Sequence, residues 1–431
     1  MAAPDIDTKH DKFHRKSFSL DYQSLSDRLI AEENILIIQD LDGVCMGLVK
    51  DPLTRAIAPK YLEAAKSLGN HFYVLTNGEH IGKRGVNGIV EKAFGDRAST
   101  RERGFYLQGL AAGGVQWQDC YGSVSHPGVS DAEMAFLAAV PAKITTYLRE
   151  LGQQPKYGLD KSRLEEYIQA TVLDNKVSPT TNLNVFHEAF KDNPQLYADL
   201  QQEIKALMDL LLAQAKKQGL GDSFFVHYAP NLGRDDRGEE IMQPSKDEDS
   251  GTTDFQFMLR GGIKEVGVLV ILNYYYYLQT GKYPLGKDFN ARQAPSGQTA
   301  LLKLVENNFD PAIMPMMVGV GDTVTSKAIE EDGRLQFKRG GSDRAFLELI
   351  QTIGREFATD SVVIYVDSSG GEVKNRRPLK LDRSNPQQIV VIEGPGDPRD
   401  TEDPLTLNVV FPEGYQQYIE FFCQVARGRQ E

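Results

Sequence analysis

Two short apolar runs, each followed by a polar turn and then by a helical pattern, limit this chain to few folds. The runs cover 34–39 (NILIIQ) and 72–75 (FYVL), and the helical patterns cover 59–68 and 82–94. Short β-branched runs between turns are typical of strands that are buried on both faces, as in parallel sheets. This order of strand, helix, strand and helix predicts an α/β fold with a parallel sheet.

The pattern changes in the middle of the chain and then returns. The segment 105–124 is rich in Gly, Gln and aromatic residues, like a set of hairpins, and helical patterns follow at 131–150 and 194–217. This mixture predicts a separate α+β unit, and 431 residues are enough for a core with a large insertion. Strand-like runs, which we interpret as the return of the first sheet, follow at 224–228, 255–259, 316–320 and 362–366, with a helical pattern at 264–278.

These patterns predict three parts. They are a flexible tail at 1–17, a core at 18–85 and 254–431, and an inserted domain at 86–253.

Composition excludes several classes of protein. The net charge of −12 repels polyanions and argues against binding to nucleic acid or to an anionic membrane. The most apolar stretch, 266–277, is shorter than the roughly 20 residues of a membrane-spanning helix, so we expect a buried helix there. Cys45, Cys120 and Cys423 have neither the spacing of a zinc site nor that of a disulfide framework. These observations favour a cytoplasmic protein.

Two carboxylates, Asp40 and Asp42, directly follow the first predicted strand. Ligands of open α/β sheets bind at the carboxyl ends of the strands, and side chains two apart along an extended segment point the same way. Both carboxylates can therefore face one reacting centre. One would attack phosphorus to form an acyl-phosphate, while the other would protonate the departing alcohol oxygen and later take a proton from water.

Three further residues have suitable chemistry for the same site. Two carboxylates beside a phosphate dianion need a cation, and oxygen ligands favour Mg²⁺. The best third acid is Asp322, in the V-G-V-G-D-T turn. Thr76, which opens a T-N-G turn, would hold phosphate oxygens together with nearby amides, and Lys264 would supply positive charge.

Each of these signals alone has an ordinary structural explanation. A D-x-D-G or T-N-G turn is often only a turn, and a lysine at a helix start is usually solvated. The set favours a site because four coincidences at three strand ends and one helix start are improbable.

The four elements occur in one order, Asp40-Leu41-Asp42-Gly43-Val44, Thr76, Lys264 and Gly321-Asp322. This order resembles the four-motif signature of the haloacid dehalogenase superfamily of phosphatases, which implies a Rossmann-like parallel-sheet core. By this resemblance Asp40 is the nucleophile and Asp42 the acid/base. The phosphate binders are Thr76, Asn77 and Lys264. The metal is Mg²⁺, held by Asp40, the backbone carbonyl of Asp42 and Asp322.

One departure concerns a second acid that many relatives carry three or four residues after the fourth-motif aspartate. Thr325 and Ser326 stand at those places here. Asp343, in the G-G-S-D-R stretch that opens a predicted helix, would supply this metal ligand after a hairpin-like insertion. Its role stays open at this point.

The insertion lies between the second and third motifs, the C2-type position, and resembles the cap of sucrose-phosphate and trehalose-phosphate phosphatases. From about residue 18 onward, whole segments resemble the cyanobacterial glucosylglycerol-phosphate phosphatases: IQDLDGVCM, FYVLTNGEHIGKRGV, LAAGGVQWQD, FFVHYAPNLGRD and YVDSSGGEVKNR. That family hydrolyses 2-O-(α-D-glucosyl)glycerol 3-phosphate to glucosylglycerol and phosphate, the last step in making a solute that protects cells against salt stress. The resemblance implies this sugar phosphate as substrate, and the synthase that makes it is a candidate partner.

Several polar side chains are candidates for binding the sugar. Trp117 with its two glutamine neighbours could stack on a sugar ring, although a core tryptophan is the more ordinary interpretation. Polar clusters also follow the T-N-G turn and the predicted strand at 224–228. From these we select Glu79, His80 and Arg234 as candidate sugar ligands, and either cluster could instead join the cap to the core.

Three other functions are compatible with parts of the sequence. The same aspartate could transfer phosphate to another acceptor or cleave another sugar phosphate. The glycine runs at 261–262 and 319–321 suggest a nucleotide-binding protein, but the chain has no P-loop motif and lacks the third glycine of a dinucleotide fingerprint. A non-catalytic module that binds the synthase would not need the paired carboxylates.

Overall fold

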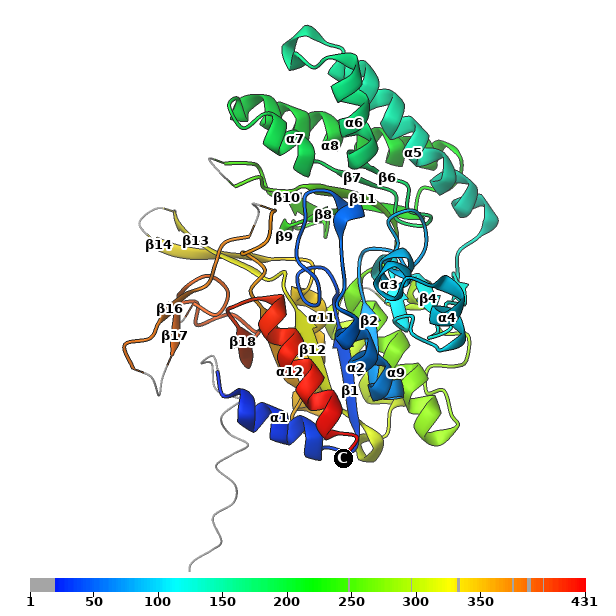
Figure 1. The fold of residues 1–431 in the computed structure, drawn as a ribbon, viewed down its shortest axis with the longest axis vertical. Coiled ribbons are helices and arrows are strands. Elements are labelled where there is room, and N and C mark those ends of the chain that lie inside the picture. Colours follow the sequence, from blue (N-terminus) through cyan, green and yellow to red (C-terminus); the bar gives the residue numbers. More distant parts are fainter. Residues whose placement is uncertain are drawn as a thin grey trace, which may run out of the picture.

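The structure has two layered parts, a large sheet between helices and a smaller sheet with helices on one face (Figure 1). It is a computed structural model that describes residues 20–246, 249–295, 297–331, 334–373, 376–385, 389–397 and 399–431. The tail predicted at 1–17 lies outside these residues.

The large sheet has eight strands in the order β18-β15-β12-β1-β2-β3-β4-β5. The strands from β18 to β3 pair in parallel, and β4 and β5 add an antiparallel edge. The predicted α/β fold class is therefore confirmed. The strands are β1 (Ile35–Gln39), β2 (Phe72–Leu75), β3 (Gly109–Ala111), β4 (Gln116–Gln118), β5 (Val124–Ser125), β12 (Met316–Gly321), β15 (Val362–Val366) and β18 (Val409–Phe411).

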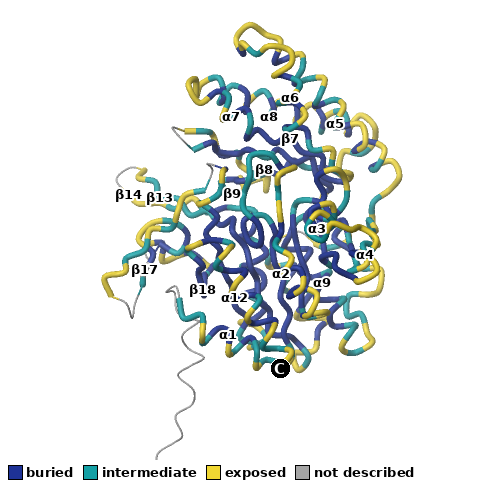
Figure 2. The backbone as a smooth tube through the Cα atoms, viewed as in Figure 1, coloured by how far each residue is buried: buried dark blue, intermediate teal, exposed yellow. Residues whose placement is uncertain are grey.

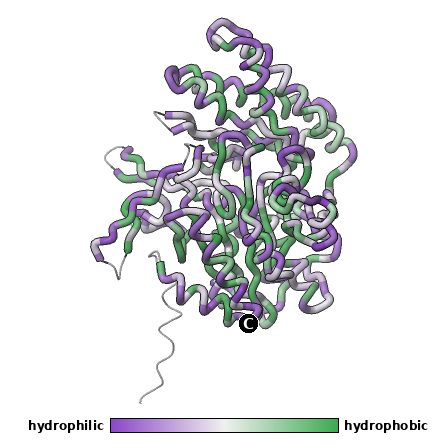
Figure 3. The backbone as a smooth tube through the Cα atoms, in the orientation of Figure 1, coloured by the Kyte–Doolittle hydropathy of each residue, from purple (hydrophilic) through white to green (hydrophobic). Residues whose placement is uncertain are grey.

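Both faces of this sheet are buried, and its central strands are apolar along their length (Figures 2 and 3). In β1, Ile35 and Ile37 belong to one hydrophobic cluster, whereas Leu36 and Ile38 belong to the other. Alternate side chains of a strand point to opposite faces, so a strand between two helical layers is apolar throughout.

Helices form a layer on each face of the large sheet (Figure 1). On the first face lie α1 (Tyr22–Ala31), α2 (Pro59–Leu68) and α12 (Tyr415–Gly428), with α3 (Val86–Phe94) beside α2 and α4 (Arg97–Glu102) beside α3. On the second face lie α9 (Lys264–Thr280), α10 (Gln298–Asn308) and α11 (Arg344–Glu356). Short 3₁₀ helices occur at Pro52–Thr54, Gly69–His71, Ala112–Gly114, Pro155–Tyr157, Ala291–Gln293 and Pro311–Ile313.

The most apolar stretch of the sequence lies in α9, which is buried as predicted. It packs against β2, β3 and α11 of the core. Within the described ranges, no helix combines the length and the apolar character that crossing a membrane requires.

The smaller sheet has four strands in the order β6-β7-β11-β8, and its neighbours pair antiparallel. Aromatic rings of Phe136, Phe224 and Phe257 pack together between this sheet and its helices. The strands are β6 (Val172–Leu173), β7 (Thr180–Asn182), β8 (Phe224–Ala229) and β11 (Asp254–Leu259). The helices are α5 (Asp131–Gly152), α6 (Lys161–Thr171), α7 (Asn184–Ala189) and α8 (Pro194–Lys217).

Sheet membership differs from the predicted boundaries of the insertion, 86–253. The segment 105–124, predicted inside the insertion, forms the edge of the large sheet. Two of the strand-like runs that we interpreted as the return of the first sheet, β8 inside 86–253 and β11 after it, instead pair with each other in the small sheet. The reason is that a strand's own residues do not specify its partner. We propose that the inserted cap runs from the end of β5 to the end of β11.

Three hairpins extend from this frame. They are β9 (Asn231–Arg234) with β10 (Glu240–Met242), β13 (Thr325–Glu331) with β14 (Arg334–Gly340), and β16 (Lys380–Asp382) with β17 (Val390–Glu393). The pair β13–β14 confirms the predicted hairpin between Asp322 and Asp343. Its strand β14 lies against β9 of the cap, where a Cβ atom on Gly340 would be 2.6 Å from the backbone nitrogen of Gly233.

A buried polar contact fixes the end of β1. Gln39 is fully buried, donates from Nε2 to Tyr61 Oη at 2.6 Å and accepts from Tyr418 Oη at 2.7 Å. Tyr61 lies on α2 and Tyr418 on α12, so one side chain joins two helices to the residue that precedes Asp40.

We expect Gln39→Leu to destabilise the protein, although leucine is the more apolar residue. Two buried tyrosine hydroxyls would each lose a partner, at a cost of about 1–3 kcal/mol for each unsatisfied group. Thermal denaturation should show a lower melting temperature. In a Tyr61→Phe, Tyr418→Phe background, Gln39→Leu should lower the melting temperature by less. An unchanged melting temperature in Gln39→Leu alone would contradict the stabilising role of this contact.

Candidate active site

A cleft lies between the carboxyl ends of the parallel strands and the helix-free face of the small sheet. Asp40, Thr76 and Asp322 line it from the ends of β1, β2 and β12, and Lys264 lines it from the start of α9. Parallel strands end at the same edge of a sheet, so residues far apart in the sequence meet there. The structure thus brings together the four elements that the sequence analysis selected.

Lys264 is buried between two carboxylates. Its Nζ lies 2.7 Å from Asp40 Oδ2 and 2.5 Å from Asp343 Oδ1. Burial alone would lower the pKa of Lys264, but the charges of Asp343 and Asp40 outweigh it and raise the pKa above its ordinary value. The lysine is therefore a fixed positive charge at the end of β1.

The Asp40 carboxylate is held from two sides. Its Oδ1 accepts the backbone amide of Leu41 at 2.8 Å, and its Oδ2 faces Lys264. Burial raises the pKa of Asp40 well above its ordinary value, and Asp343 and Asp322 add to this, whereas Lys264 lowers it. The ionised form of Asp40 depends on the cation beside it.

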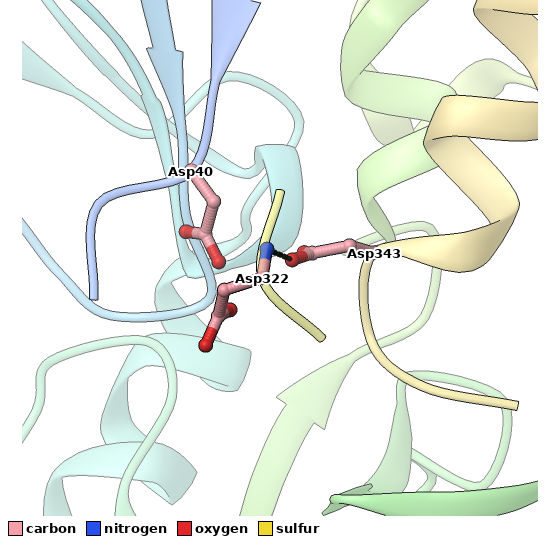
Figure 4. A group of neighbouring side chains, drawn as sticks. All are labelled: Asp40, Asp322 and Asp343. Atoms are coloured by element: carbon pink, nitrogen blue, oxygen red, sulfur yellow. Dashed lines mark hydrogen bonds between the residues drawn. The ribbon is translucent and has the colours of Figure 1, made fainter. Parts of the chain in front are cut away.

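Three carboxylates from separate elements lie close together (Figure 4), and two of them contact this lysine. One oxygen each of Asp40, Asp322 and Asp343 lies within 4.8 Å of the others. Asp343 Oδ2 accepts the backbone amides of Asp322 and Thr323, both at 2.9 Å. Both oxygens of Asp343 therefore have partners, and Asp343 fixes the turn that carries Asp322.

The two oxygens of Asp322 differ. Oδ1 accepts the Thr323 hydroxyl at 2.7 Å, whereas Oδ2 is buried and accepts no hydrogen bond within the described part of the chain. A Cβ atom on Gly43 would lie 2.1 Å from this Oδ2, so glycine at this position leaves room for the oxygen. An unsatisfied, buried carboxylate oxygen beside further carboxylates fits a hard divalent cation such as Mg²⁺.

Asp42 also lines the cleft but points to an arginine. Its side chain is 34% exposed, and its Oδ2 lies 3.0 Å from Arg55 Nη1. Strand β1 ends at Gln39, directly before Asp40, and the chain then turns at Gly43, which has a φ of +80°. Both predicted carboxylates reach one cleft, with Asp42 nearer its solvent side.

The T-N-G turn connects the core with the cap. Thr76 is buried, and its hydroxyl accepts the Gly78 amide at 3.2 Å. Asn77 Nδ2 lies 3.0 Å from Nε2 of His227 on cap strand β8. The turn therefore faces the cleft with Thr76 and contacts the cap with Asn77.

The three predicted sugar ligands have different positions. Glu79 is 3% exposed and accepts the backbone amides of a cap loop, those of Lys176, Val177 and Ser178, at 2.6 to 2.9 Å. This arrangement matches the alternative that the cluster joins the cap to the core. His80 is fully buried, lies against the Gly109 carbonyl and is not among the described residues that line the cleft. Burial lowers the pKa of His80 to about 4.

Arg234 lines a neighbouring cavity, which Lys264 also lines. Its guanidinium lies 3.7 Å from Glu240 and 3.9 Å from Glu265. Trp117 packs against Tyr73 and Tyr274, which corresponds to the core interpretation of this tryptophan.

Several residues of the cleft were not predicted from the sequence. Arg376 donates from Nη2 to Thr323 Oγ1 at 2.9 Å, and its Nε lies 3.8 Å from Asp322 Oδ2. No spacing rule connects this arginine with the acids. Asp254 and Gln256 line the cleft from β11, and their alternation with phenylalanines in D-F-Q-F was the signal that could have identified a polar sheet face.

Comparison with known proteins identifies similar chains. The family model of glucosylglycerol-phosphate phosphatase matches residues 34–426. The glucosylglycerol-phosphate phosphatase of Synechocystis sp. is 56% identical over 416 residues, 96% of this chain and 98% of the relative. Among solved structures, the C-terminal domain of C. albicans trehalose-6-phosphate phosphatase covers 95% of this chain and 98% of its own, with 12% identity and a TM-score of 0.47. The structure of Aspergillus fumigatus trehalose-6-phosphate phosphatase covers 83% of this chain and 92% of its own, with 12% identity and a TM-score of 0.35. These structural likenesses are too weak to bear on activity.

We expect Gly43→Ala to weaken Mg²⁺ binding at least about tenfold, because the new methyl group would displace the Asp322 carboxylate. Isothermal titration with Mg²⁺ measures this. Gly219→Ala is the matched control, since Gly219 has a φ of +79° and open space around its Cβ position. Equal Mg²⁺ affinity in both variants would show that the contact with Asp322 is unimportant.

Proposed function

The chain belongs to the glucosylglycerol-phosphate phosphatase family, and we propose that it hydrolyses 2-O-(α-D-glucosyl)glycerol 3-phosphate to glucosylglycerol and phosphate. The match of the family model and the 56% identical relative support this substrate. The chemistry is supported by one geometric observation above all. Asp40 ends a parallel strand in a cleft, with Lys264 at 2.7 Å and two further carboxylates beside it.

Asp40 attacks phosphorus in this proposal and forms an acyl-phosphate. Lys264 stabilises the negative charge on Asp40 and on the transferring group. Asp42, on the solvent side of the cleft, gives a proton to the departing glycerol oxygen and then takes one from the attacking water. Thr76 and the amides that follow β2 hold the non-bridging oxygens of the phosphoryl group.

Mg²⁺ is the proposed cofactor, and when bound it offsets the charge of the phosphate and the carboxylates. Asp40, the Asp42 carbonyl and Asp322 would hold it. The buried, unsatisfied Asp322 Oδ2 supports this set. Asp343 contacts Lys264 through one oxygen and the backbone amides of the Asp322 turn through the other, so we assign it the role of positioning both.

The proposed setting is a reducing cytoplasm. Cys45, Cys120 and Cys423 are all unpaired, which suits such a compartment. A contact with the synthase that makes the substrate rests on the family resemblance alone.

Asp40→Asn should abolish phosphate release from glucosylglycerol phosphate, with a loss of at least about 10³-fold in kcat. The change is nearly isosteric but removes the nucleophile, and Lys264 keeps Asp343 as a partner. Purified protein is assayed for phosphate release from this substrate, with sucrose and trehalose phosphates alongside. Asp288→Asn, an exposed aspartate outside the cleft, should retain full activity. Preference of the wild type for another sugar phosphate would overturn the substrate assignment, and activity of Asp40→Asn would overturn the mechanism.

Phosphate release should also depend on Mg²⁺. We expect an excess of EDTA to stop turnover and added Mg²⁺ to restore it, because the carboxylates and the phosphate otherwise repel each other. The measurement compares initial rates before chelation, after it and after Mg²⁺ addition. Rates that chelation leaves unchanged would contradict the assignment of Mg²⁺.

A further inference from the structure

The cap presents a polar sheet face to the cleft and an apolar face to its own helices. Phe255 and Phe257 of β11 are buried in the cap core. Successive strand residues point to opposite faces, so the residues between them face the other way. The cleft-facing residues of β7 and β11, which we call the cap patch, are Thr180, Asn182, Asp254 and Gln256.

The register joins these side chains into one continuous patch. Asn182 pairs with Asp254, and Thr180 pairs with Gln256. Directly opposite residues of antiparallel strands are close neighbours. Asn182 Nδ2 donates to Asp254 Oδ1 at 2.6 Å, which holds both groups toward the cleft.

Gln256 has an unsatisfied hydrogen-bond acceptor in this patch. Its side chain lines the cleft, the residue is only 8% exposed, and Oε1 is buried without a hydrogen bond from any residue that the structure describes. Buried polar atoms in proteins normally have a partner. A hydroxyl group of a ligand can donate to Oε1, whereas an ionised phosphate or carboxylate has no proton to donate.

The charges of the cleft disfavour a second anionic group at the patch. Asp254 has no ion pair with any cation in the described ranges. Each cationic side chain that lines the cleft there already has a carboxylate within 4 Å. These pairs are Lys264 with Asp40, Arg55 with Asp42, Arg84 with Asp174 and Arg376 with Asp322.

We propose that the cap patch binds the hydroxyl groups of a neutral polyol leaving group, and that it determines specificity in two ways. Gln256 accepts a hydrogen bond from a substrate hydroxyl. Asp254 excludes leaving groups that carry a carboxylate or a second phosphate. The inference rests on the proposed phosphatase function and assigns sugar recognition to this patch rather than to Glu79, His80 and Arg234.

The test uses two substrates that differ in one group. One is 2-O-(α-D-glucosyl)glycerol 3-phosphate, and the other is glucosyl-3-phosphoglycerate, which has a carboxylate where the first has a hydroxymethyl group. The variants are Gln256→Met, which keeps the length but removes the acceptor, and Asp254→Asn, which keeps the acceptor for Asn182. Thr181→Val is the control, because Thr181 lies between two patch residues, is buried, and its hydroxyl has no hydrogen-bond partner among the residues that the structure describes. Burial raises the pKa of Asp254 to about 6, so an assay at pH 8 keeps this carboxylate charged.

We expect Gln256→Met to raise KM for glucosylglycerol phosphate about 3- to 10-fold with little change in kcat, since it removes one hydrogen bond to the substrate. Asp254→Asn should raise the ratio of kcat/KM for glucosyl-3-phosphoglycerate to kcat/KM for glucosylglycerol phosphate about tenfold, because it removes a like-charge contact. Thr181→Val should match the wild type in both measurements.

A binding measurement keeps this test separate from the proposed activity. Titration of the wild type and the variants with glucosylglycerol, the neutral product, requires no turnover. Weaker binding by Gln256→Met than by Thr181→Val supports the cap patch even in a protein that hydrolyses another phosphate. Equal binding and equal KM in Gln256→Met and the wild type, with unchanged melting temperatures, would overturn the role of Gln256. An unchanged substrate ratio in Asp254→Asn would overturn the role of Asp254.

Discussion

The geometry of the site depends on one buried ammonium between two buried carboxylates. Lys264 holds the end of β1 through Asp40 and the start of α11 through Asp343. Removing one partner of a buried ion pair typically costs about 3–5 kcal/mol, because the remaining charge is left in a medium of low polarity. The packing of α9 and α11 on the sheet therefore also keeps the Lys264 ammonium next to the carboxylates of Asp40 and Asp343. Through its second oxygen Asp343 extends this constraint to the turn of Asp322.

The sequence predicted what local pattern and parallel topology determine. The β1 and β2 strands, and α2 and α8, were predicted nearly residue by residue, because their apolar periodicity and turn residues are local. Asp40, Thr76 and Asp322 could be grouped because residues at the carboxyl ends of parallel strands converge. The role of Asp343 could not be decided, since it depends on a hairpin whose length sets where the chain returns.

Pairing and register account for what the sequence did not predict. Nothing within β8 or β11 indicates that they pair with each other and not with the large sheet. The cap patch depends on the register between β7 and β11. Arg376 reaches the acids from a segment outside the strands of the sheet, so no periodicity marks it. Glu79 lines the cleft and also accepts three backbone amides of a cap loop, a contact that its own sequence neighbours do not indicate.

The contact between β14 and β9 has a consequence for how the two parts of the molecule can separate. At Gly233 and Gly340 the two backbones approach so closely that a Cβ atom on either would lie 2.6 Å from a backbone atom of the other strand. The hairpin that carries Gly340 also connects Asp322 with Asp343 along the chain. Any hinge rotation of the cap must therefore slide or break this glycine contact, so the loop between the two acids is part of the mechanical linkage between cap and core. The length of chain between the acids, which obscures the usual spacing of the motif, provides that linkage.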